Sequence, residues 1–131
     1  MEENKLIYKE LSYEITGILF EVHNELGRFS REKQYCDVLE DKLKLKNKKY
    51  KREFRVSDTG NIVDFVVNDQ IVIEAKAKST LTKEDYYQLQ RYLQSTGLKL
   101  GLLVNFRNRY LKPIRVVRID TDVRKKFTKN D

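Results

Sequence analysis

The sequence predicts an α/β fold with a mixed central sheet flanked by helices, in the order helix, helix, three strands, helix, strand, strand. Apolar residues recur at three- and four-residue steps along the first third of the chain, which indicates two amphipathic helices. Three short segments rich in β-branched and aromatic residues follow, divided by turn residues. A further helical segment then separates two apolar strands, and such a crossover places the two strands parallel in one sheet.

The two leading helices are expected over residues 5–26 and 30–45. Gly27 stands where a helix C-cap belongs, and the Ser30 hydroxyl is expected to cap the second helix. The apolar stripe of the first helix consists of Leu11, Ile15, Ile18, Leu19, Val22 and Leu26.

The first three strands are expected over residues 50–56, 62–67 and 71–77. Turn-forming residues at 58–60 and 68–70 divide them, so we expect an antiparallel meander. After the meander, the pattern predicts a helix over residues 82–96 that is capped by Thr82. Residues 98–106 indicate a buried strand, residues 113–119 an edge strand that opens at a proline, and the tail from about residue 120 is expected to fray.

The chain of 131 residues fits a single domain spanning residues 1–131, because one core of ordinary size uses that length. Hydrophobic residues make up 40% and charged residues 36%, which predicts a packed core under a highly charged surface. No apolar run reaches the roughly 20 residues of a membrane-spanning helix, and the first residues lack the apolar stretch of a signal peptide. We therefore expect a cytoplasmic protein without a membrane partner.

Cys36 and His23 are the single cysteine and the single histidine, so the sequence offers no disulfide and no cluster of zinc ligands. Any bound metal is expected to be a hard ion held by oxygen atoms. The net charge of +7 and the pI near 9.4 favour polyanionic partners such as nucleic acid.

The run VDFVVNDQIVIEAKAK carries the residues of chemical interest. Alternate side chains of a strand share a face, so an odd number of residues in the connection makes one face wholly apolar. The same register places Asp64 beside Glu74, with Lys76 next along the strand. A two-residue turn would instead place Asp64 among apolar side chains, which is expensive for a carboxylate. The predicted apolar face consists of Val63, Phe65, Val67, Ile71, Ile73 and Ala75.

Two adjacent carboxylates repel each other, so this register predicts a divalent cation between Asp64 and Glu74, with Mg²⁺ the first candidate and Mn²⁺ the alternative. Such an ion binds a phosphate oxygen and lowers the pKa of a water molecule, while Lys76 orients that water or stabilises the growing charge. The set suits hydrolysis of a phosphodiester. Lys78, on the same strand face, is the alternative lysine, and the competing interpretation is a solvated Glu–Lys surface pair.

Asp64, nine further residues and then Glu74-Ala75-Lys76 resemble the signature of the PD-(D/E)XK nuclease superfamily. Val63 stands in place of the proline of that signature. The order of helices and strands is also similar to the superfamily core, so the resemblance implies a restriction-endonuclease-like fold over most of the chain. It further implies a metal-dependent nuclease in which the Ala75 carbonyl adds a metal ligand.

A narrower resemblance is to the GxxExxY family, a group of small proteins placed in the same superfamily. Phe29 stands where that family has its first naming glycine, so the entry to the second helix is expected to differ. The resemblance implies a nuclease without an established substrate. The shared landmarks are EVHNELG at residues 21–27, EKQY at 32–35, IEAK at 73–76, QLQRY at 88–92 and GLLVNF at 101–106.

Gln88 and Tyr92 resemble the Gln-x-x-x-Tyr motif of RecB-type nucleases, and their four-residue spacing puts both on one helix face. The resemblance implies that both support the site. The alternative is that Tyr92 packs in the core while Gln88 is solvated.

Glu32 is the candidate for an additional metal ligand or an acceptor to the water around the ion, and it matches the glutamate of the GxxExxY motif. The alternative is an ordinary first-turn glutamate that the helix dipole favours. Glu14 and Glu21 remain alternatives for the same role. His23 is either a general base or a residue that packs near a helix end.

Basic residues concentrate in two stretches, residues 42–55 and 107–118. We expect the second stretch to track phosphates, because it follows the strand after the predicted site helix and arginine grips phosphate with two parallel bonds. Tyr50, Phe54 and Tyr110 would stack on bases if exposed, and the alternative is a solubilising surface. The expected contacts to nucleic acid, with DNA favoured over RNA, are Lys78, Arg107, Arg109, Lys112 and Arg115.

Three functions are consistent with these patterns. The first is a Mg²⁺-dependent nuclease, which the intact Asp64, Glu74 and Lys76 favour. The second is a non-catalytic nucleic-acid-binding or assembly module of the same fold. The third is a dimeric junction-resolving endonuclease, which an exposed apolar dimer face would favour. The sequence leaves open monomer or homodimer, and exonuclease or endonuclease.

Overall fold

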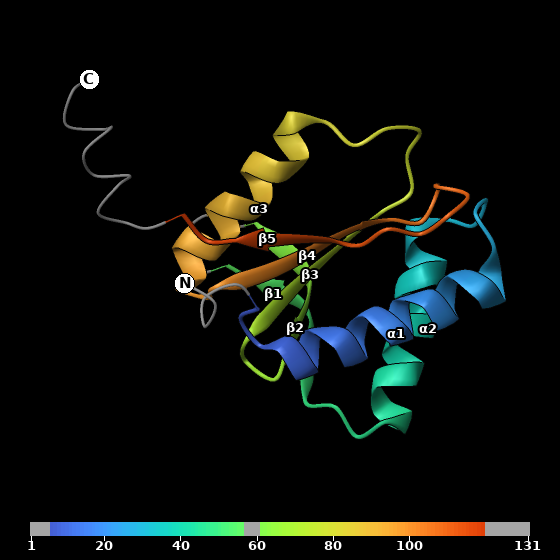
Figure 1. Ribbon diagram of the computed structural model, residues 1–131, viewed down its shortest axis with the longest axis horizontal. Coiled ribbons are helices and arrows are strands. Elements are labelled where there is room, and N and C mark those ends of the chain that lie inside the picture. The colour runs from blue at the N-terminus through green and yellow to red at the C-terminus, as the bar shows by residue number, and fades with distance from the viewer. Residues whose placement is uncertain (1–5, 57–60, 120–131) are drawn as a thin grey trace.

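The computed structural model describes residues 6–56 and 61–119, in which helices cover both faces of a five-stranded sheet (Figure 1). The order of elements is the predicted one. The predicted turn at residues 58–60 and the tail from residue 120 lie outside the described residues. The elements are α1 (Lys9–Leu26), α2 (Glu32–Leu45), β1 (Tyr50–Arg55), β2 (Ile62–Val67), β3 (Ile71–Lys76), α3 (Lys83–Thr96), β4 (Leu100–Asn105) and β5 (Ile114–Val117).

The sheet has the strand order β1-β2-β3-β4-β5, so β1 and β5 are its edges. The first three strands form the predicted antiparallel meander. β3 and β4 pair in parallel, with α3 as the crossover between them, and β5 runs antiparallel to β4. β5 begins one residue after Pro113, as expected for an edge strand, because proline cannot donate to a ladder.

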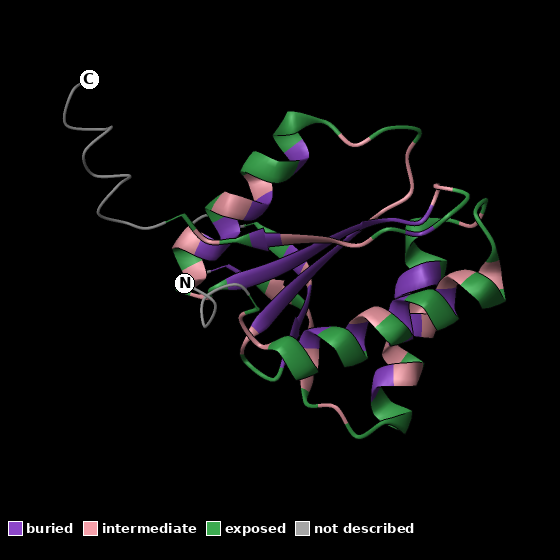
Figure 2. Cartoon of the chain, viewed as in Figure 1, coloured by how far each residue is buried: buried purple, intermediate pink, exposed green. Residues whose placement is uncertain are grey.

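Two apolar layers hold the helices to the sheet. α1 and α2 pack on one face, and α3 packs on the other (Figure 1). β4 is buried along its whole length, and the helices expose their outer faces (Figure 2). The central strands β3 and β4 are therefore largely apolar on both faces, with Glu74 as the buried exception and Asn105 at the end of β4. No helix of the described residues is long and apolar enough to cross a membrane.

The register between β2 and β3 is the predicted one: Phe65 pairs with Ile73, and Val67 pairs with Ile71. The three-residue connection at 68–70 produces it. Asn68 and Asp69 there both have φ 55°, in the left-handed region that Asn and Asp tolerate better than most residues.

The predicted apolar face is wrong at one position, because Val63 packs with the residues under α3 while Phe65 packs under α1 and α2. In a continued ladder the Ala75 N–H would meet the Val63 carbonyl, but it donates to the Asp64 carboxylate instead. Glu53, across from this step on β1, has φ 52°, which also breaks the regular alternation. The pleat is interrupted at Asp64, so Val63 turns to the opposite layer.

The entry to α2 also differs from the prediction. Arg31 is the N-cap, and its N–H donates to Oε1 of Gln34 over 2.8 Å. The Ser30 hydroxyl instead donates back to the carbonyl of Leu26 at the end of α1, 3.4 Å away. Sequence spacing alone does not separate these two uses of a serine between two helices.

We expect Gly101→Ala to destabilise the fold, because an added Cβ would lie 2.9 Å from the side chain of Leu89, which is fully buried in α3. Overpacking of this kind costs about 1–3 kcal/mol of unfolding free energy. Gly17→Ala is the matched control: its Cβ meets nothing within 4 Å, and alanine in a helix interior stabilises by about 0.5–1 kcal/mol. Urea unfolding of both variants measures the difference, and equal stabilities would contradict the packing described.

Candidate metal and phosphodiester site

The side chains of Asp64 on β2 and Glu74 on β3 each accept a hydrogen bond from the backbone of the other residue's strand. The Asp64 N–H donates to Oε1 of Glu74 over 2.9 Å, and the Ala75 N–H donates to Oδ2 of Asp64 over 2.7 Å. Glu74 is only 6% exposed, whereas Asp64 is half-buried and lines a pocket. The predicted adjacency of Asp64 and Glu74 is confirmed, and a solvated surface pair is excluded for Glu74.

Burial raises the pKa of Asp64, and it raises the pKa of Glu74 as well. Desolvation is the largest cause for both groups, because a charged carboxylate loses hydration when it is buried. The charge of Asp64 adds to the effect on Glu74, and the charge of Glu32 acts on both. Lys76 opposes these effects without cancelling them. The pair is thus short of positive charge.

Lys76 lies between two acids. Its Nζ is 4.0 Å from Oε2 of Glu74 and 3.9 Å from Oδ1 of Asp85, which projects from the first turn of α3. Lys78 donates to the same Asp85 carboxylate over 2.9 Å, but β3 has ended before Lys78. Lys76 is therefore the lysine beside the carboxylate pair, and Lys78 is anchored on its outer side.

Asp85, in the first turn of α3, is a residue whose role the sequence did not show. It is 7% exposed and accepts hydrogen bonds from the Thr82 N–H and from Lys78. Burial opposes its ionisation, but these bonds outweigh burial, and the pKa of Asp85 is lowered. Its fixed negative charge holds both lysines. Two lysines in the run EAKAK with an acid in the next helix were the available sequence signal.

Asn105 at the end of β4 is the second residue whose role the sequence did not show. Its side chain accepts from the Lys78 N–H and from the Arg107 N–H, and it donates to the Lys78 carbonyl. These bonds pin the segment after β3 to the segment after β4. A single buried amide at the end of the apolar run LGLLVN was the signal that marked it.

Gln88 and Tyr92 lie on the face of α3 that is turned to the sheet, where Tyr92 packs in the core beside Leu89 and Leu93. The site also affects Tyr92. Burial is the largest cause that raises the pKa of its phenol, and the charges of Glu74 and Asp64 raise this pKa further. The two interpretations of Tyr92 are therefore compatible. Gln88 is half-buried one helical turn earlier.

Glu32 opens α2 at the rim of a pocket of about 270 Å³, which it lines together with Cys36, Arg52 and Asp64. Its side chain is exposed, and it acts on the carboxylate pair through its charge. Within residues 6–56 and 61–119, no three Asp, Glu, His or Cys side chains gather closely enough to ligate one ion. Glu32 is therefore not grouped with Asp64 and Glu74 as a third carboxylate ligand, although its charge acts on both.

The donors at the pair nevertheless fit a hard divalent cation. Each carboxylate has one oxygen bound to the opposite backbone, which leaves its second oxygen for a ligand. In an extended strand the N–H and C=O of one residue point to the same neighbour, so the Ala75 carbonyl faces the Asp64 side. Mg²⁺ typically takes one or two carboxylates and fills its remaining positions with water and substrate phosphate.

Buried Cys36 adds no nucleophile to this pocket. Burial, followed by the negative charge of Asp64, raises the pKa of its thiol to about 12. A thiol with so high a pKa is protonated at neutral pH and unreactive. The pocket is therefore a place for oxygen ligands and cations rather than for thiol chemistry.

His23 and Tyr35 fix the loops beside the site. His23 Nε2 lies 2.9 Å from the Asn108 carbonyl, so the ring holds the loop between β4 and β5. The Tyr35 hydroxyl donates to the Gly27 carbonyl, and its ring stacks on Phe106 with centroids 4.2 Å apart. Packing, rather than general-base chemistry, accounts for the position of His23.

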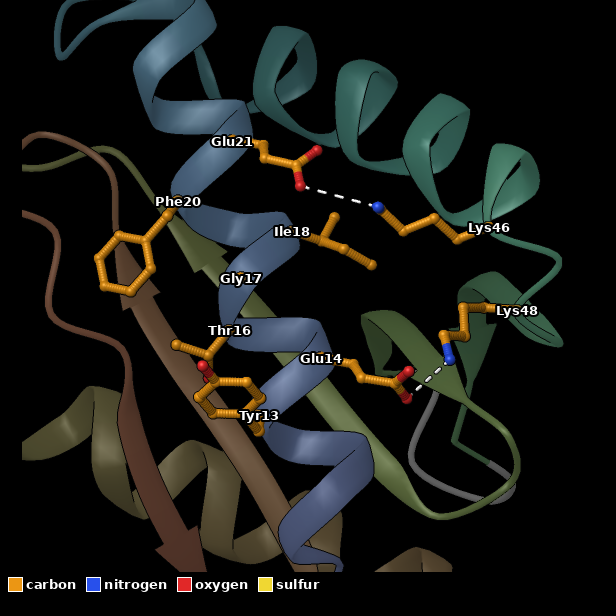
Figure 3. A pocket seen from close by; sticks show the side chains of 9 residues that line it. All are labelled: Tyr13, Glu14, Thr16, Gly17, Ile18, Phe20, Glu21, Lys46 and Lys48. Atoms are coloured by element: carbon orange, nitrogen blue, oxygen red, sulfur yellow. Dashed lines mark hydrogen bonds and ion pairs between the residues drawn. The ribbon is translucent and has the colours of Figure 1, made fainter.

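Glu14 and Glu21, the alternatives to Glu32, face away from the carboxylate pair. They line a groove between α1 and the segment after α2, where Glu14 pairs with Lys48 and Glu21 with Lys46 (Figure 3). Tyr13 and Phe20, which are exposed, project from the other side of α1 in the same view. Neither glutamate supports the site.

The first basic stretch is largely neutralised by acids of the same chain. Tyr50 donates to Glu40, and Phe54 packs under α3, so neither ring is free for a base. The ion pairs of this stretch are Lys42 with Glu21 and Glu25, Lys46 with Glu21, Lys48 with Glu14, Lys49 and Lys51 with Asp69, and Arg52 with Asp37 and Glu40.

The second basic stretch divides in two. Arg115 donates to the Ser12 hydroxyl over 2.6 Å and to the Ile7 carbonyl over 2.8 Å, and burial lowers its pKa. Its guanidinium ties β5 to the start of α1, which removes it from the predicted nucleic-acid contacts. Arg107, Arg109 and Lys112 lie in the loop between β4 and β5 and form no ion pair within the described part of the chain.

The comparisons with known proteins agree with this geometry. Residues 9–118 match the PD-(D/E)XK nuclease superfamily. No curated protein is similar enough in sequence to count as a relative. Among solved structures, the chain is similar to that of an alkaline exonuclease (LHK-Exo) from Laribacter hongkongensis, at 15% identity and a TM-score of 0.47. That match covers 68% of this chain and 57% of the exonuclease, so this chain spans little more than half of the exonuclease's length.

The match to the superfamily spans nearly all of the described residues, from the start of α1 to the end of β5. The five-stranded mixed sheet with helices on both faces is the restriction-endonuclease-like fold that the sequence predicted. The superfamily generally uses divalent metal ions, in keeping with the oxygen donors at the carboxylate pair. The chain therefore belongs to the PD-(D/E)XK nuclease superfamily.

Proposed function

We propose that this protein is a metal-dependent nuclease that hydrolyses phosphodiester bonds at Asp64, Glu74 and Lys76, with DNA the favoured substrate. The observation that carries the proposal is the buried carboxylate pair, whose raised pKa values signal missing positive charge. Burying two uncompensated carboxylates costs stability, and an enzyme has a reason to keep them. A structural pair would be expected to have a full ionic partner.

The residues that would hold the ion are Asp64, Glu74 and the Ala75 carbonyl, with Mg²⁺ preferred over Mn²⁺. A bound divalent ion supplies Lewis acidity toward a phosphate oxygen and makes water a better nucleophile at neutral pH. Glu32 serves as an acceptor in the water shell at the rim of the pocket rather than as a ligand. Gln88 and Tyr92 line the α3 side of the site.

Lys76 acts on the substrate through its ammonium group. It is partly buried, and Glu74 and Asp85 limit its freedom, so its charge is preorganised at the pair. We assign to it the positioning of the attacking water and the stabilisation of the negative charge that grows on the phosphorus-centred transition state. Asp85 is a positioning residue, because it acts through Lys76 and does not reach the substrate itself.

We further propose that the chain is one nuclease domain of the GxxExxY type. Glu32 and Tyr35 occupy the corresponding positions at the start of α2, and Tyr35 fixes the preceding loop. Arg107, Arg109 and Lys112 would contact phosphates of the substrate, with Lys78 between them and the site. The alternative, a binding module without catalysis, predicts the same fold but no use for the carboxylate pair.

A dimeric enzyme is the second candidate, because α1 and the turn before it expose Leu6, Tyr13 and Phe20 at seven-residue intervals. Such spacing puts apolar groups on one side of a helix, where a second copy of the chain would cover them. The pair of sites in such a dimer suits a junction-resolving endonuclease.

Lys76→Ala should abolish cleavage. Removing one preorganised charge at a transition state costs about 10²–10³-fold in kcat. Lys78→Ala is the matched control, since it removes a lysine that shares Asp85 but stands outside the pair, and it should lose less than about tenfold. End-labelled single-stranded DNA, duplex DNA and RNA, each with Mg²⁺, Mn²⁺ or chelator, provide the assay. Salt-sensitive binding without cleavage by the wild type would favour the binding module.

Glu74→Gln should make the metal-free protein more stable at pH 8, by about 2 kcal/mol. A carboxyl whose pKa is raised by folding binds its proton more tightly in the folded state, so wild-type stability falls as pH rises above its ordinary pKa. The Glu74→Gln variant has no carboxyl at this position, so it does not lose this stability as pH rises. Urea unfolding in chelator at pH 4.5 and pH 8 should give similar stabilities at the lower pH and a gain only at the higher one. A gain of equal size at both would refute the electrostatic cause.

Mg²⁺ should raise the melting temperature of the wild type at pH 8 and leave that of Asp64→Asn nearly unchanged. A ligand that binds only the folded state at 100 times its Kd stabilises by about 2.7 kcal/mol. Glu84→Gln is the control, because Glu84 pairs with Arg91 on the outside of α3, and its response should equal that of the wild type. A wild type whose melting temperature changes with neither Mg²⁺ nor Mn²⁺ would rule out the metal site.

A further inference from the structure

A large aromatic side chain stands in solvent between two loops, outside both core layers of the described residues. Phe29, in the loop between α1 and α2, is 76% exposed. The guanidinium carbon of Arg28 lies 4.9 Å from the centre of its ring, and that of Arg107 lies 5.6 Å from it. The ring therefore lies between two cations and keeps most of its surface open to solvent.

The two loops that carry this ring are fixed to each other. Arg28 Nε donates to the Arg107 carbonyl and Arg107 Nε donates to the Arg28 carbonyl, each over 2.9 Å. The side chains of His23 and Tyr35 also bond to the backbone of these loops, at Asn108 and Gly27. The α1–α2 loop and the β4–β5 loop lie side by side at one end of the molecule (Figure 1). The ring is therefore presented on a preformed surface, which lowers the entropic cost of binding.

The charge at this surface is unneutralised. Within residues 6–56 and 61–119, Arg28, Arg107 and Arg109 pair with no carboxylate, in contrast to the lysines that flank β1. Arg109 lies 5.3 Å from the ring centre of Tyr110, a second aromatic side chain that is 77% exposed. Arginine beside an exposed ring therefore occurs twice on these loops, and both sets of cations are available to an anion.

The surface borders the carboxylate pair. Phe29 precedes Glu32, at the rim of the pocket of Asp64, by three residues. On the other side, the Arg107 N–H bonds to Asn105, which also holds the segment that follows Lys76. The two loops that carry this surface are therefore joined along the chain to segments that border the candidate site.

We propose that Phe29, flanked by Arg28 and Arg107, is a stacking platform for an unpaired nucleobase, so that the nuclease takes a single strand or the single-stranded end of a duplex. An unpaired base offers a free face to an aromatic ring, whereas the bases inside a duplex are already stacked on each other. Stacking tolerates any base, and the arginines suit the flanking phosphates. The inference deepens the proposed function, on which its catalytic meaning rests.

Binding can be measured without cleavage, in chelator, with a single-stranded DNA that carries 2-aminopurine as a fluorescent base. Phe29→Ala should bind this strand about tenfold more weakly and lose the stacking-induced fluorescence change, since base stacking on an aromatic residue commonly contributes this much. Phe29→Trp should keep both. Tyr87→Ala, which removes an exposed ring on α3, should bind like the wild type. Affinity for a blunt-ended DNA duplex without a loop should change less than twofold in all variants, because its bases are paired and roughly equal phosphate contacts remain.

Two results would overturn the platform: equal single-strand affinity for Phe29→Ala and the wild type, or an equal loss on the blunt-ended duplex, which would show that Phe29 does not select unpaired bases. The cleavage assay stays separate. A protein that stacks the base but never cuts in Mg²⁺ or Mn²⁺ would keep this platform and lose the proposed nuclease activity. Cleavage by a protein whose binding does not depend on Phe29 would keep the proposed nuclease activity and lose the platform.

Discussion

The hydrogen bonds between Asp64 and the backbone of β3, and between Glu74 and the backbone of β2, set the arrangement of everything around them. They stop the regular ladder one step beyond Phe65 and Ile73 and replace backbone acceptors with carboxylates. Two consequences follow. Val63 turns to the layer under α3, and the Ala75 N–H bonds to the Asp64 carboxylate rather than to the backbone of β2. The candidate site thus lies where the pairing of β2 with β3 ends, and the acids at that point are the ones that would hold an ion.

This constraint also explains why the fold needs charge from elsewhere. Desolvation and mutual repulsion act against the ionised pair, and the nearest positive group, Lys76, is shared with Asp85. Asp85 mainly holds Lys76 in position, because the charge of Asp85 is already stabilised by Thr82 and Lys78. The sheet supplies the acids and α3 supplies the support for the lysine. Neither element alone makes the site, so the crossover between β3 and β4 is part of the chemistry.

Sequence reasoning predicted the elements, the antiparallel and parallel pairings and the neighbouring Asp64 and Glu74, because strand alternation and burial admit one register. It was wrong where a decision depended on three-dimensional neighbours: the Ser30 hydroxyl bonds to the end of α1 instead of capping α2, and Arg115 bonds to Ser12 of α1. The role of Glu32, which lines the same pocket as Asp64, stays a prediction. Asn105 was missed because its partners come from other segments, about which spacing along one strand carries no information. The bond of Asp85 to the Thr82 N–H follows from helix-capping spacing, but its bond to Lys78 joins two elements and could not be read from spacing.

The same reasoning applies to the positive charge of the whole chain. A net charge of +7 suggests a polyanionic partner but does not locate it. The basic residues fall into two groups. Those that flank β1 are paired with acids of α1, α2 and the turn after β2, whereas those of the β4–β5 loop form no ion pair within the described part of the chain. Paired cations gain little by releasing counterions from nucleic acid, since they must first give up a partner. The unpaired ones lie in the loop after β4, beside the exposed rings of Phe29 and Tyr110. The proposed binding surface and the candidate site therefore both lie near the ends of β3 and β4.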